Sequence, residues 1–536
     1  MASKNSLPPA AHDYPNALLT AEPGHLVCSP RYLWLAGLLL ACLLPRMMVA
    51  GRVESLCPDG VLYLTLAKAL AAGDLAGGLR DMHLNTLPVI LAALHRAGIP
   101  WEATGKVWGV LISTLAVLPL FGWVRRQFDD RVALISCMLY AVQPQFIRWS
   151  PETIRDPTFW FFFTLALYWL WQAEVEVRPG TFWLAGVAIT LAGLTRTEGL
   201  LLLIPLGFWT WTRYWALRRG RKTLLLGVLA CLSVAPTLVV LVNLTLLHRH
   251  SHWELARLDP LQFIRVWLRA QAALVTPGDS SAVTTVGMSF QAMLREFVPD
   301  LYKGFTPVYG LLMLGGLAAW RRTWLRRDQL ALFYTSLALL ASIWCHLWIG
   351  HATCPRYLLP IVIMASPFTA LGLLGFVHWL AGAADRLRVP TGFTRLAIAG
   401  CLAAVAVGGV GFALGSEFRQ RRVEADLGRW LHQRSGPRPV LAGPEGLAQV
   451  VNYYAQGSCR QFPGAASPDE VLTAVSQSHP DMLLLVCTRH RDYHQPELVE
   501  EIRRTGLQPV DDPKLLGDCS DLMLFVRKDS GRGRLR

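Results

Sequence analysis

The stretch YLWLAGLLLACLLPRMMVA, residues 32–50, decides the fold class of this chain. It is almost entirely apolar, and a helix needs roughly 20 such residues to cross the hydrocarbon core of a bilayer. The run begins too far from Met1, is too long, and lacks a small-residue cleavage pattern for a removed signal peptide. We therefore expect a retained membrane anchor.

The same pattern recurs along the 536 residues, of which 53% are hydrophobic and 20 are tryptophan. This composition is too apolar for a soluble enzyme. The sequence predicts an all-α polytopic membrane protein with about 11 transmembrane helices. The apolar runs are 32–50, 106–124, 132–148, 157–173, 181–195, 199–215, 223–247, 305–320, 329–349, 357–380 and 396–415.

Basic residues in alternate short loops predict the orientation, because Lys and Arg are retained on the cytoplasmic side. The loops 125–131, 213–222, 321–327 and 385–388, with nearby flanking positions, hold 16 basic and six acidic residues. This excess of ten accounts for most of the net charge of +14. The charge therefore reflects topology and predicts no nucleic-acid partner. We expect a cytoplasmic N-terminus and an outer C-terminus.

Three parts follow from this topology: a cytoplasmic tail over 1–30, a membrane domain over 31–415, and an extracytoplasmic domain over 416–536. In the outer segment 51–105, VLYLTLAKALAAG and LPVILAALHRAG have helical spacing but are too short to span, which predicts interfacial helices. A second amphipathic stretch, LDPLQFIRVWLRAQAAL, falls in 248–304. The tail alternates strand-like runs such as DMLLLVCT with capped helices, which predicts a small α/β domain.

Polar residues gather where the predicted helices reach the outer face. They lie in the segments CPDGVLY, DMHLNTLP, SPETIRDP, TRTEG and CPRYLLP. The centres of the runs hold almost no ionisable residues, whereas an ion-coupled transporter would place them near the midplane. Arginines in outer loops oppose the charge bias, and a guanidinium is suited to binding phosphate. Snorkelling to lipid headgroups is the alternative for any single arginine.

These motifs resemble those of the polyprenyl-phosphate-dependent GT-C membrane glycosyltransferases, the bacterial relatives of protein O-mannosyltransferases and aminoarabinose transferases. The resemblance covers about 30–380 and rests on PDGVLYLTLAKAL, HLNTLP, RRQFDDRVAL, SPETIRDP, LAGLTRTEGLLLL and RYLLP, in that order. Many relatives carry a second acid after the first one, where this chain has Gly60. No cofactor is therefore predicted; a divalent metal is the alternative, which the sequence does not support.

The resemblance implies an inverting transfer of a sugar from a polyprenyl-phosphate donor to an acceptor hydroxyl at the outer face of the bacterial inner membrane. Asp59 would be the general base, and Asp156 would hold the acceptor or assist the base. Other predicted site residues bind the phosphate (Arg356, Arg155, Arg196 and Tyr357) or support the site (Tyr63, His83 and Glu198). The acceptor could be a protein, a lipid or a glycan, and the sugar stays open.

Structural roles compete with these assignments. Asp59 could instead be the N-cap of the helix that begins near Gly60. Asp156 precedes Pro157, a pair that also suits the first turn of a helix, and Glu198 could stabilise a helix start through the dipole. GGVGF (408–412) is better interpreted as helix packing than as a phosphate loop.

Two further hypotheses concern the site and the function. Cys57 and Cys354 flank the two main site segments and would face an oxidising compartment, so a disulfide between them is conceivable. A non-enzymatic flippase of a lipid-linked substrate would also need outer arginines, but it should show a polar path through the bilayer. A membrane anchor that presents the C-terminal tail as a binding module would not need eleven spans.

Overall fold

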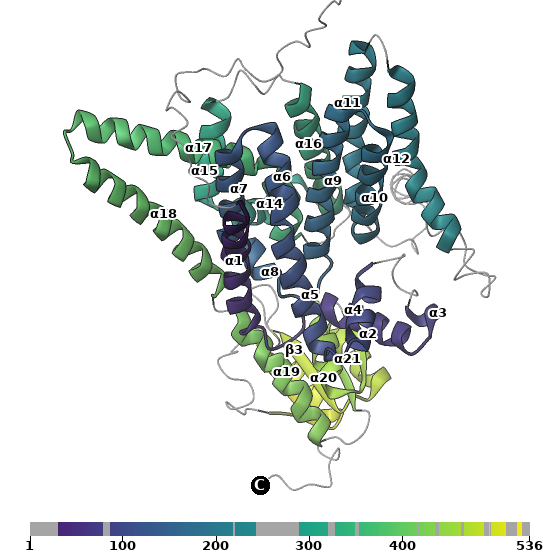
Figure 1. The fold of residues 1–536 in the computed structure, drawn as a ribbon. Coiled ribbons are helices and arrows are strands. Elements are labelled where there is room, and N and C mark those ends of the chain that lie inside the picture. The colour runs from purple at the N-terminus through teal and green to yellow at the C-terminus, as the bar shows by residue number, and fades with distance from the viewer. Residues whose placement is uncertain are drawn as a thin grey trace, which may run out of the picture.

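The chain folds into a helical membrane domain with a small sheet at one end (Figure 1). The computed structural model describes residues 31–78, 86–217, 220–242, 289–319, 327–348, 353–415, 417–434, 439–462, 466–486, 493, 495–510 and 522–527. Over the described residues, each of the eleven predicted runs overlaps one or two helices. These are α1 (Arg31–Ala50), α5 (Trp101–Leu115) with α6 (Val117–Gln127), α7 (Asp130–Val142) with α8 (Pro144–Trp149), α9 (Asp156–Glu176), α10 (Pro179–Thr195), η1 (Thr197–Leu202) with α11 (Leu203–Ala216), α12 (Arg221–Val242), α15 (Pro307–Ala319), α16 (Arg327–Trp348), η4 (Pro355–Leu358) with α17 (Leu359–Arg386), and α18 (Thr391–Ala413).

Five helical stretches in the described part of the chain are long and apolar enough to cross a membrane: Trp101–Gln127, Arg221–Leu238, Gln329–Trp348, Pro355–Arg386 and Gly392–Ala413. Several other apolar helices are shorter. The protein is therefore a multi-pass membrane protein, while the count of eleven spans stays a prediction. The main core lies among α6, α7, α9, α10 and α17, with α9 packed along α10.

The predicted run 132–148 is broken at Gln143 into α7 and α8, and buried polar groups explain the break. The Gln143 side chain accepts from the amide of Phe146 at 3.0 Å and donates to the carbonyl of Gly304 at 2.7 Å. Arg46, fully buried on α1, donates to the carbonyl of Ala141 at the end of α7 and to Ser150 beyond α8. Partners for the freed backbone groups make such a break tolerable inside a membrane.

The first outer segment is helical, as predicted, with α2 (Pro58–Ala71), α3 (Leu75–Gly78) and α4 (Thr86–Arg96). A further amphipathic helix, α14 (Phe290–Phe305), precedes α15. The stretch LDPLQFIRVWLRAQAAL lies outside the described residues. The GGVGF motif serves helix packing: a Cβ at Gly409 would collide with the carbonyl of Val142 at the end of α7.

The C-terminal residues form the predicted small α/β unit. A polar helix, α19 (Glu417–Arg434), leads to β1 (Val440–Pro444), α20 (Leu447–Ala455), β2 (Ser458–Phe462), α21 (Pro468–Ser478), β3 (Met482–Val486), α22 (Pro496–Arg504), β4 (Leu507–Pro509) and β5 (Leu522–Arg527). The strand order is β2-β1-β3-β5-β4. The β1 strand pairs in parallel with β2 and β3, whereas β5 is antiparallel to β3 and β4. The sequence missed α20, β2 and β4.

The sheet lies at the same end of the molecule as α2, α3 and α4, the lower end in Figure 1. Helix α20 packs on α2, and α19 runs beside α20. The predicted outer elements therefore share one end of the helical domain with the C-terminal unit.

Candidate active site

Asp59 lies in the first turn of α2 but does not cap it. Cys57 is the N-cap residue, and its Sγ accepts from the amide of Gly60 at 3.3 Å. Pro58 fills the first helical position, where its missing N–H has no cost. The N-cap interpretation of Asp59 is therefore wrong. Its carboxylate does not serve as the helix cap, and its side chain is 45% exposed.

Asp59 meets Arg356 across 297 positions of sequence, with Nη2 of Arg356 donating to Oδ2 of Asp59 at 2.5 Å. Arg356 belongs to η4, the short turn before α17. Its guanidinium lies over the ring of Trp149 at 5.3 Å, and its buried Nε makes no hydrogen bond. The structure thus brings these two predicted site residues into contact.

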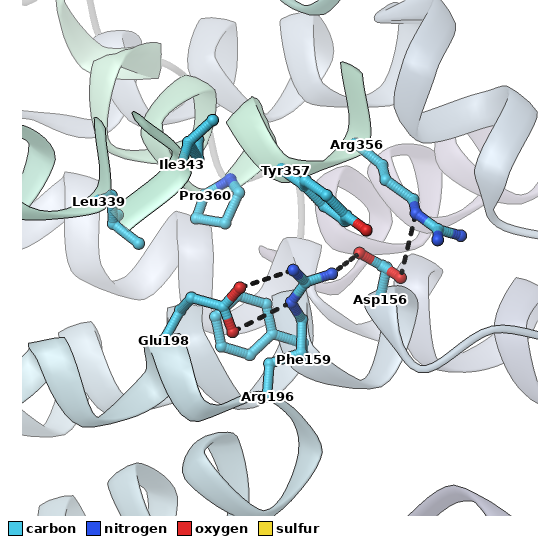
Figure 2. A pocket seen from close by; sticks show the side chains of 9 residues that line it. All are labelled: Asp156, Phe159, Arg196, Glu198, Leu339, Ile343, Arg356, Tyr357 and Pro360. Carbon is cyan, nitrogen blue, oxygen red and sulfur yellow. Dashed lines mark hydrogen bonds and ion pairs between the residues drawn. The ribbon is translucent and has the colours of Figure 1, made fainter. Parts of the chain in front are cut away.

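A second ion-pair chain continues from this pair into the bundle. The Asp156 carboxylate at the start of α9 accepts from Nη1 of Arg196 at 2.6 Å, and its other oxygen lies 3.9 Å from Nε of Arg356. Arg196 also donates from Nη2 to Glu198 at 2.7 Å. Figure 2 shows the resulting order Glu198, Arg196, Asp156, Arg356. Asp156 is only 3% exposed, so this charge is held by its two arginines.

Tyr357 covers the ion-pair chain from one side (Figure 2). Its ring lies 4.6 Å from the guanidinium carbon of Arg196 and 5.5 Å from that of Arg356. The side chains of Leu339, Ile343 and Pro360 line the same pocket (Figure 2). The pocket therefore combines charged side chains with apolar ones.

Two residues near the site have shifted pKa values. Burial acts to raise the pKa of Glu198, but the Arg196 guanidinium outweighs it and lowers that pKa to about 2. Burial raises the pKa of Tyr63 to about 12, with nearby Arg155 opposing the change. Glu198 is therefore a carboxylate and Tyr63 a neutral phenol at physiological pH.

The remaining predicted residues are placed unevenly. Tyr63 is buried on α2 beside residues of the C-terminal unit. Arg155 is the N-cap residue of α9, and among the described residues its guanidinium forms no hydrogen bond or ion pair. His83 lies outside the described residues. Asp156 lies in the first turn of α9 and Glu198 in the first turn of η1. Their predicted role at a helix start is therefore compatible with a place in the site.

Gly60, where relatives carry a second acid, packs against a neighbouring loop. A Cβ at this position would lie 3.1 Å from Cβ of Thr153 and 3.2 Å from its carbonyl oxygen. A larger residue therefore needs Thr153 to move. In the part of the chain that the structure describes, no three His, Cys, Asp or Glu side chains are grouped as metal ligands.

The suggested disulfide is wrong for this structure, because Cys57 and Cys354 both carry thiols. Cys57 instead caps α2, as described above. Cys354 is the N-cap residue of η4, and burial raises the pKa of its thiol. Each cysteine therefore begins the turn that presents a charged site residue two positions later.

Two residues near the site were not predicted from the sequence. Trp149, at the end of α8, supports Arg356 through its ring, and its place directly before SPETIRDP was the available signal. Asp300 on α14 accepts from the hydroxyl of Thr353 at 2.6 Å, three residues before Arg356. Nothing in the sequence pairs 300 with 353.

Comparison with known proteins supports the resemblance inferred from the motifs. Residues 103–240 match the family model described as dolichyl-phosphate-mannose-protein mannosyltransferase. The chain has the GT-C fold. Among solved structures it is similar to ArnT from Cupriavidus metallidurans bound to undecaprenyl phosphate, with 17% identity, a TM-score of 0.57, and coverage of 94% of this chain and 99% of that one.

Other similar structures include ArnT from the same organism in the apo state, with 17% identity, a TM-score of 0.56, and coverage of 92% of this chain and 97% of that one. The archaeal oligosaccharyltransferase AglB from Archaeoglobus fulgidus, in complex with an inhibitory peptide and a dolichol-phosphate, has 13% identity and a TM-score of 0.53, with coverage of 85% and 69%. No curated protein sequence matches the chain. The family-model match and the fold together indicate a glycosyltransferase.

Proposed function

We propose that the protein transfers a sugar, with inversion, from a polyprenyl-phosphate donor to an acceptor hydroxyl at the outer face of the membrane. The observation that carries the proposal is the contact of the half-exposed Asp59 carboxylate with Arg356 at 2.5 Å, at the end of the helical domain. In this proposal Asp59 is the base and Arg356 is the phosphate-binding cation next to it. Similar folds bind undecaprenyl phosphate and dolichol-phosphate, which supports this class of donor.

The donor phosphate would bind between Arg356 and Arg155. Arg356 has a buried Nε without a hydrogen bond, and Arg155 is uncommitted among the described residues. A phosphate supplies the acceptor oxygens that both groups need. Arg196 is already held by Asp156 and Glu198, so its geometry favours a role in fixing Asp156 over direct phosphate binding. Tyr357 would cover the phosphate as it covers both guanidinium groups.

The reaction would be a single displacement. As the acceptor oxygen attacks the anomeric carbon, Asp59 takes the hydroxyl proton, and the bond from that carbon to the phosphate oxygen breaks. The bonding electrons leave with the lipid phosphate, where the arginines stabilise the growing negative charge. The phosphate also competes with Asp59 for Arg356, so donor binding would free the carboxylate to act as base. The attack opposite the leaving group inverts the anomeric centre.

The proposal includes the location of the site. The plasma membrane would hold residues 31–415, with 1–30 in the cytoplasm and 416–536 outside. The basic loops support this orientation. A protein, a lipid or a glycan hydroxyl would serve as the acceptor.

Transfer assays on purified protein in lipid nanodiscs test the proposal. Labelled polyprenyl-phosphate sugars and candidate acceptors are supplied, and the Asp59→Asn variant is compared with wild type. Loss of a general base should lower the rate about 10²–10⁴-fold. Asp74→Asn is the matched control, since Asp74 is an exposed acid in the same outer segment that only caps α3. Equal rates for wild type and Asp59→Asn would contradict the mechanism. Transbilayer movement of the lipid without transfer would favour a flippase.

A further inference from the structure

The C-terminal unit contacts the start of α2 both before and after Asp59. The hydroxyl of Tyr454, on α20, accepts from the backbone amide of Leu56 at 3.1 Å. Both residues are buried. This hydrogen bond joins positions 398 residues apart and fixes the chain just before α2 begins.

Gly446 makes the second contact at the start of α20. It has a positive φ of 84°, a backbone conformation suited to glycine. A Cβ at this position would lie 3.3 Å from Cγ of Pro58, the residue directly before Asp59. The backbone of the C-terminal unit therefore lies directly against the first turn of α2.

A shared apolar core continues the contact along α2. It includes Val61, Tyr63 and Leu64 of α2 with Ala425 of α19 and Val450 of α20, all buried. Because these residues belong to one cluster, α2 is packed against the C-terminal unit as well as against the membrane domain.

Polar pairs complete the interface at its two ends. The Lys68 ammonium, on the last turn of α2, donates to the hydroxyl of Tyr453 at 3.2 Å and lies over its ring. Before α2, Glu54 pairs with Arg422 of α19 at 3.0 Å. Exposed pairs of this kind add little stability, so the buried Tyr454 and Gly446 contacts carry the argument.

We propose that the C-terminal unit is a positioning element of the active site, with Tyr454 as its main positioning residue. It holds the first turn of α2 where the Asp59 carboxylate reaches Arg356. The inference rests on the proposed function of Asp59.

The test removes one hydroxyl. In the full-length protein, Tyr454→Phe keeps the ring in the core and leaves the buried Leu56 amide without its acceptor. We expect faster hydrogen–deuterium exchange over residues 56–64. A displaced base should lower kcat about tenfold while the KM for the donor stays nearly constant, because the phosphate-binding residues are untouched.

Tyr493→Phe is the matched control. Its hydroxyl donates to the carbonyl of Ala466 at 2.8 Å, wholly within the C-terminal unit. It should lower the stability of that unit but leave kcat and the exchange of α2 unchanged. A second control, Tyr453→Phe, removes the contact at the far end of α2 and should have a smaller effect on kcat than Tyr454→Phe.

Two results would overturn the inference: unchanged exchange over 56–64 in Tyr454→Phe, or an equal loss of kcat in Tyr493→Phe. Hydrogen–deuterium exchange can be measured whether or not the protein transfers a sugar. If wild type transferred no sugar from any donor, the proposed function would fail, whereas the exchange data would still decide whether the C-terminal unit holds α2.

Discussion

The ion pair of Glu198 with Arg196 yields a prediction whose size follows from the structure. Burial would raise the pKa of Glu198, but Arg196, donating to both carboxylate oxygens, lowers it from 4.5 to about 2. At about 1.36 kcal/mol for each pKa step, this difference corresponds to roughly 3 kcal/mol of stability. One ion pair, between the buried Arg196 and the partly exposed Glu198, thus accounts for a sizeable part of a typical folding free energy.

The sign of the pH dependence follows from the lowered pKa. The folded state holds the proton of Glu198 more weakly than the unfolded state does. The stabilisation is therefore complete above pH 4.5 and is lost progressively as the pH falls toward 2. Between pH 6 and pH 3 the pair should lose about 2 kcal/mol.

The assay compares wild type with Glu198→Gln by reversible denaturation in mixed detergent micelles from pH 6 to pH 3. The free energy of unfolding of wild type should exceed that of the variant at pH 6, and the gap should shrink by about 2 kcal/mol at pH 3. Glu176→Gln is the control, since Glu176 lies 4.0 Å from an exposed Arg178. Its gap to wild type should stay small at all pH values.

A gap between wild type and Glu198→Gln that stays constant with pH would refute the reasoning. It would mean that Glu198 ionises alike in the folded and unfolded states. The ion-pair chain through Arg196 would then not be formed in the folded protein.

Two further predictions concern the same end of the molecule. Arg196→Lys should lower both transfer activity and melting temperature, because a lysine cannot hold Asp156 and Glu198 with a planar fork; Lys at full wild-type activity would contradict this role. Gly60→Asp should destabilise the protein by about 1–3 kcal/mol through overpacking against Thr153. Thermal unfolding with and without Mg²⁺ measures this cost, and a rescue by the metal would show that the site accepts a second acid.

The sequence was informative about elements because helix formation and membrane insertion are local properties. An apolar run satisfies its own backbone in lipid by forming a helix, so its helical state follows from composition. The polar segments at the outer ends were visible for the same reason, since charges such as those of Asp59 and Arg356 stand out beside apolar runs. The strands β1, β3 and β5 also appear as apolar runs, whereas the short exposed β2 does not.

The sequence did not predict which charged side chains pair with one another. The sequence assigned Arg196 to phosphate, but it did not predict that the fold pairs this side chain with Asp156 and Glu198. It offered Asp59 as a possible N-cap, and only the position of Cys57 in the helix start excluded that role.

The sequence by itself determined that this is a multi-pass helical protein and which segments beside its apolar runs carry the candidate site residues. Only the tertiary structure decided which charges meet, and that Tyr454 reaches the backbone before Asp59. The physical reason is the distance along the sequence over which each property is determined. Burial of an apolar helix depends on neighbours in sequence, whereas the pairing of side chains 297 or 398 positions apart depends on how all the helices between them pack.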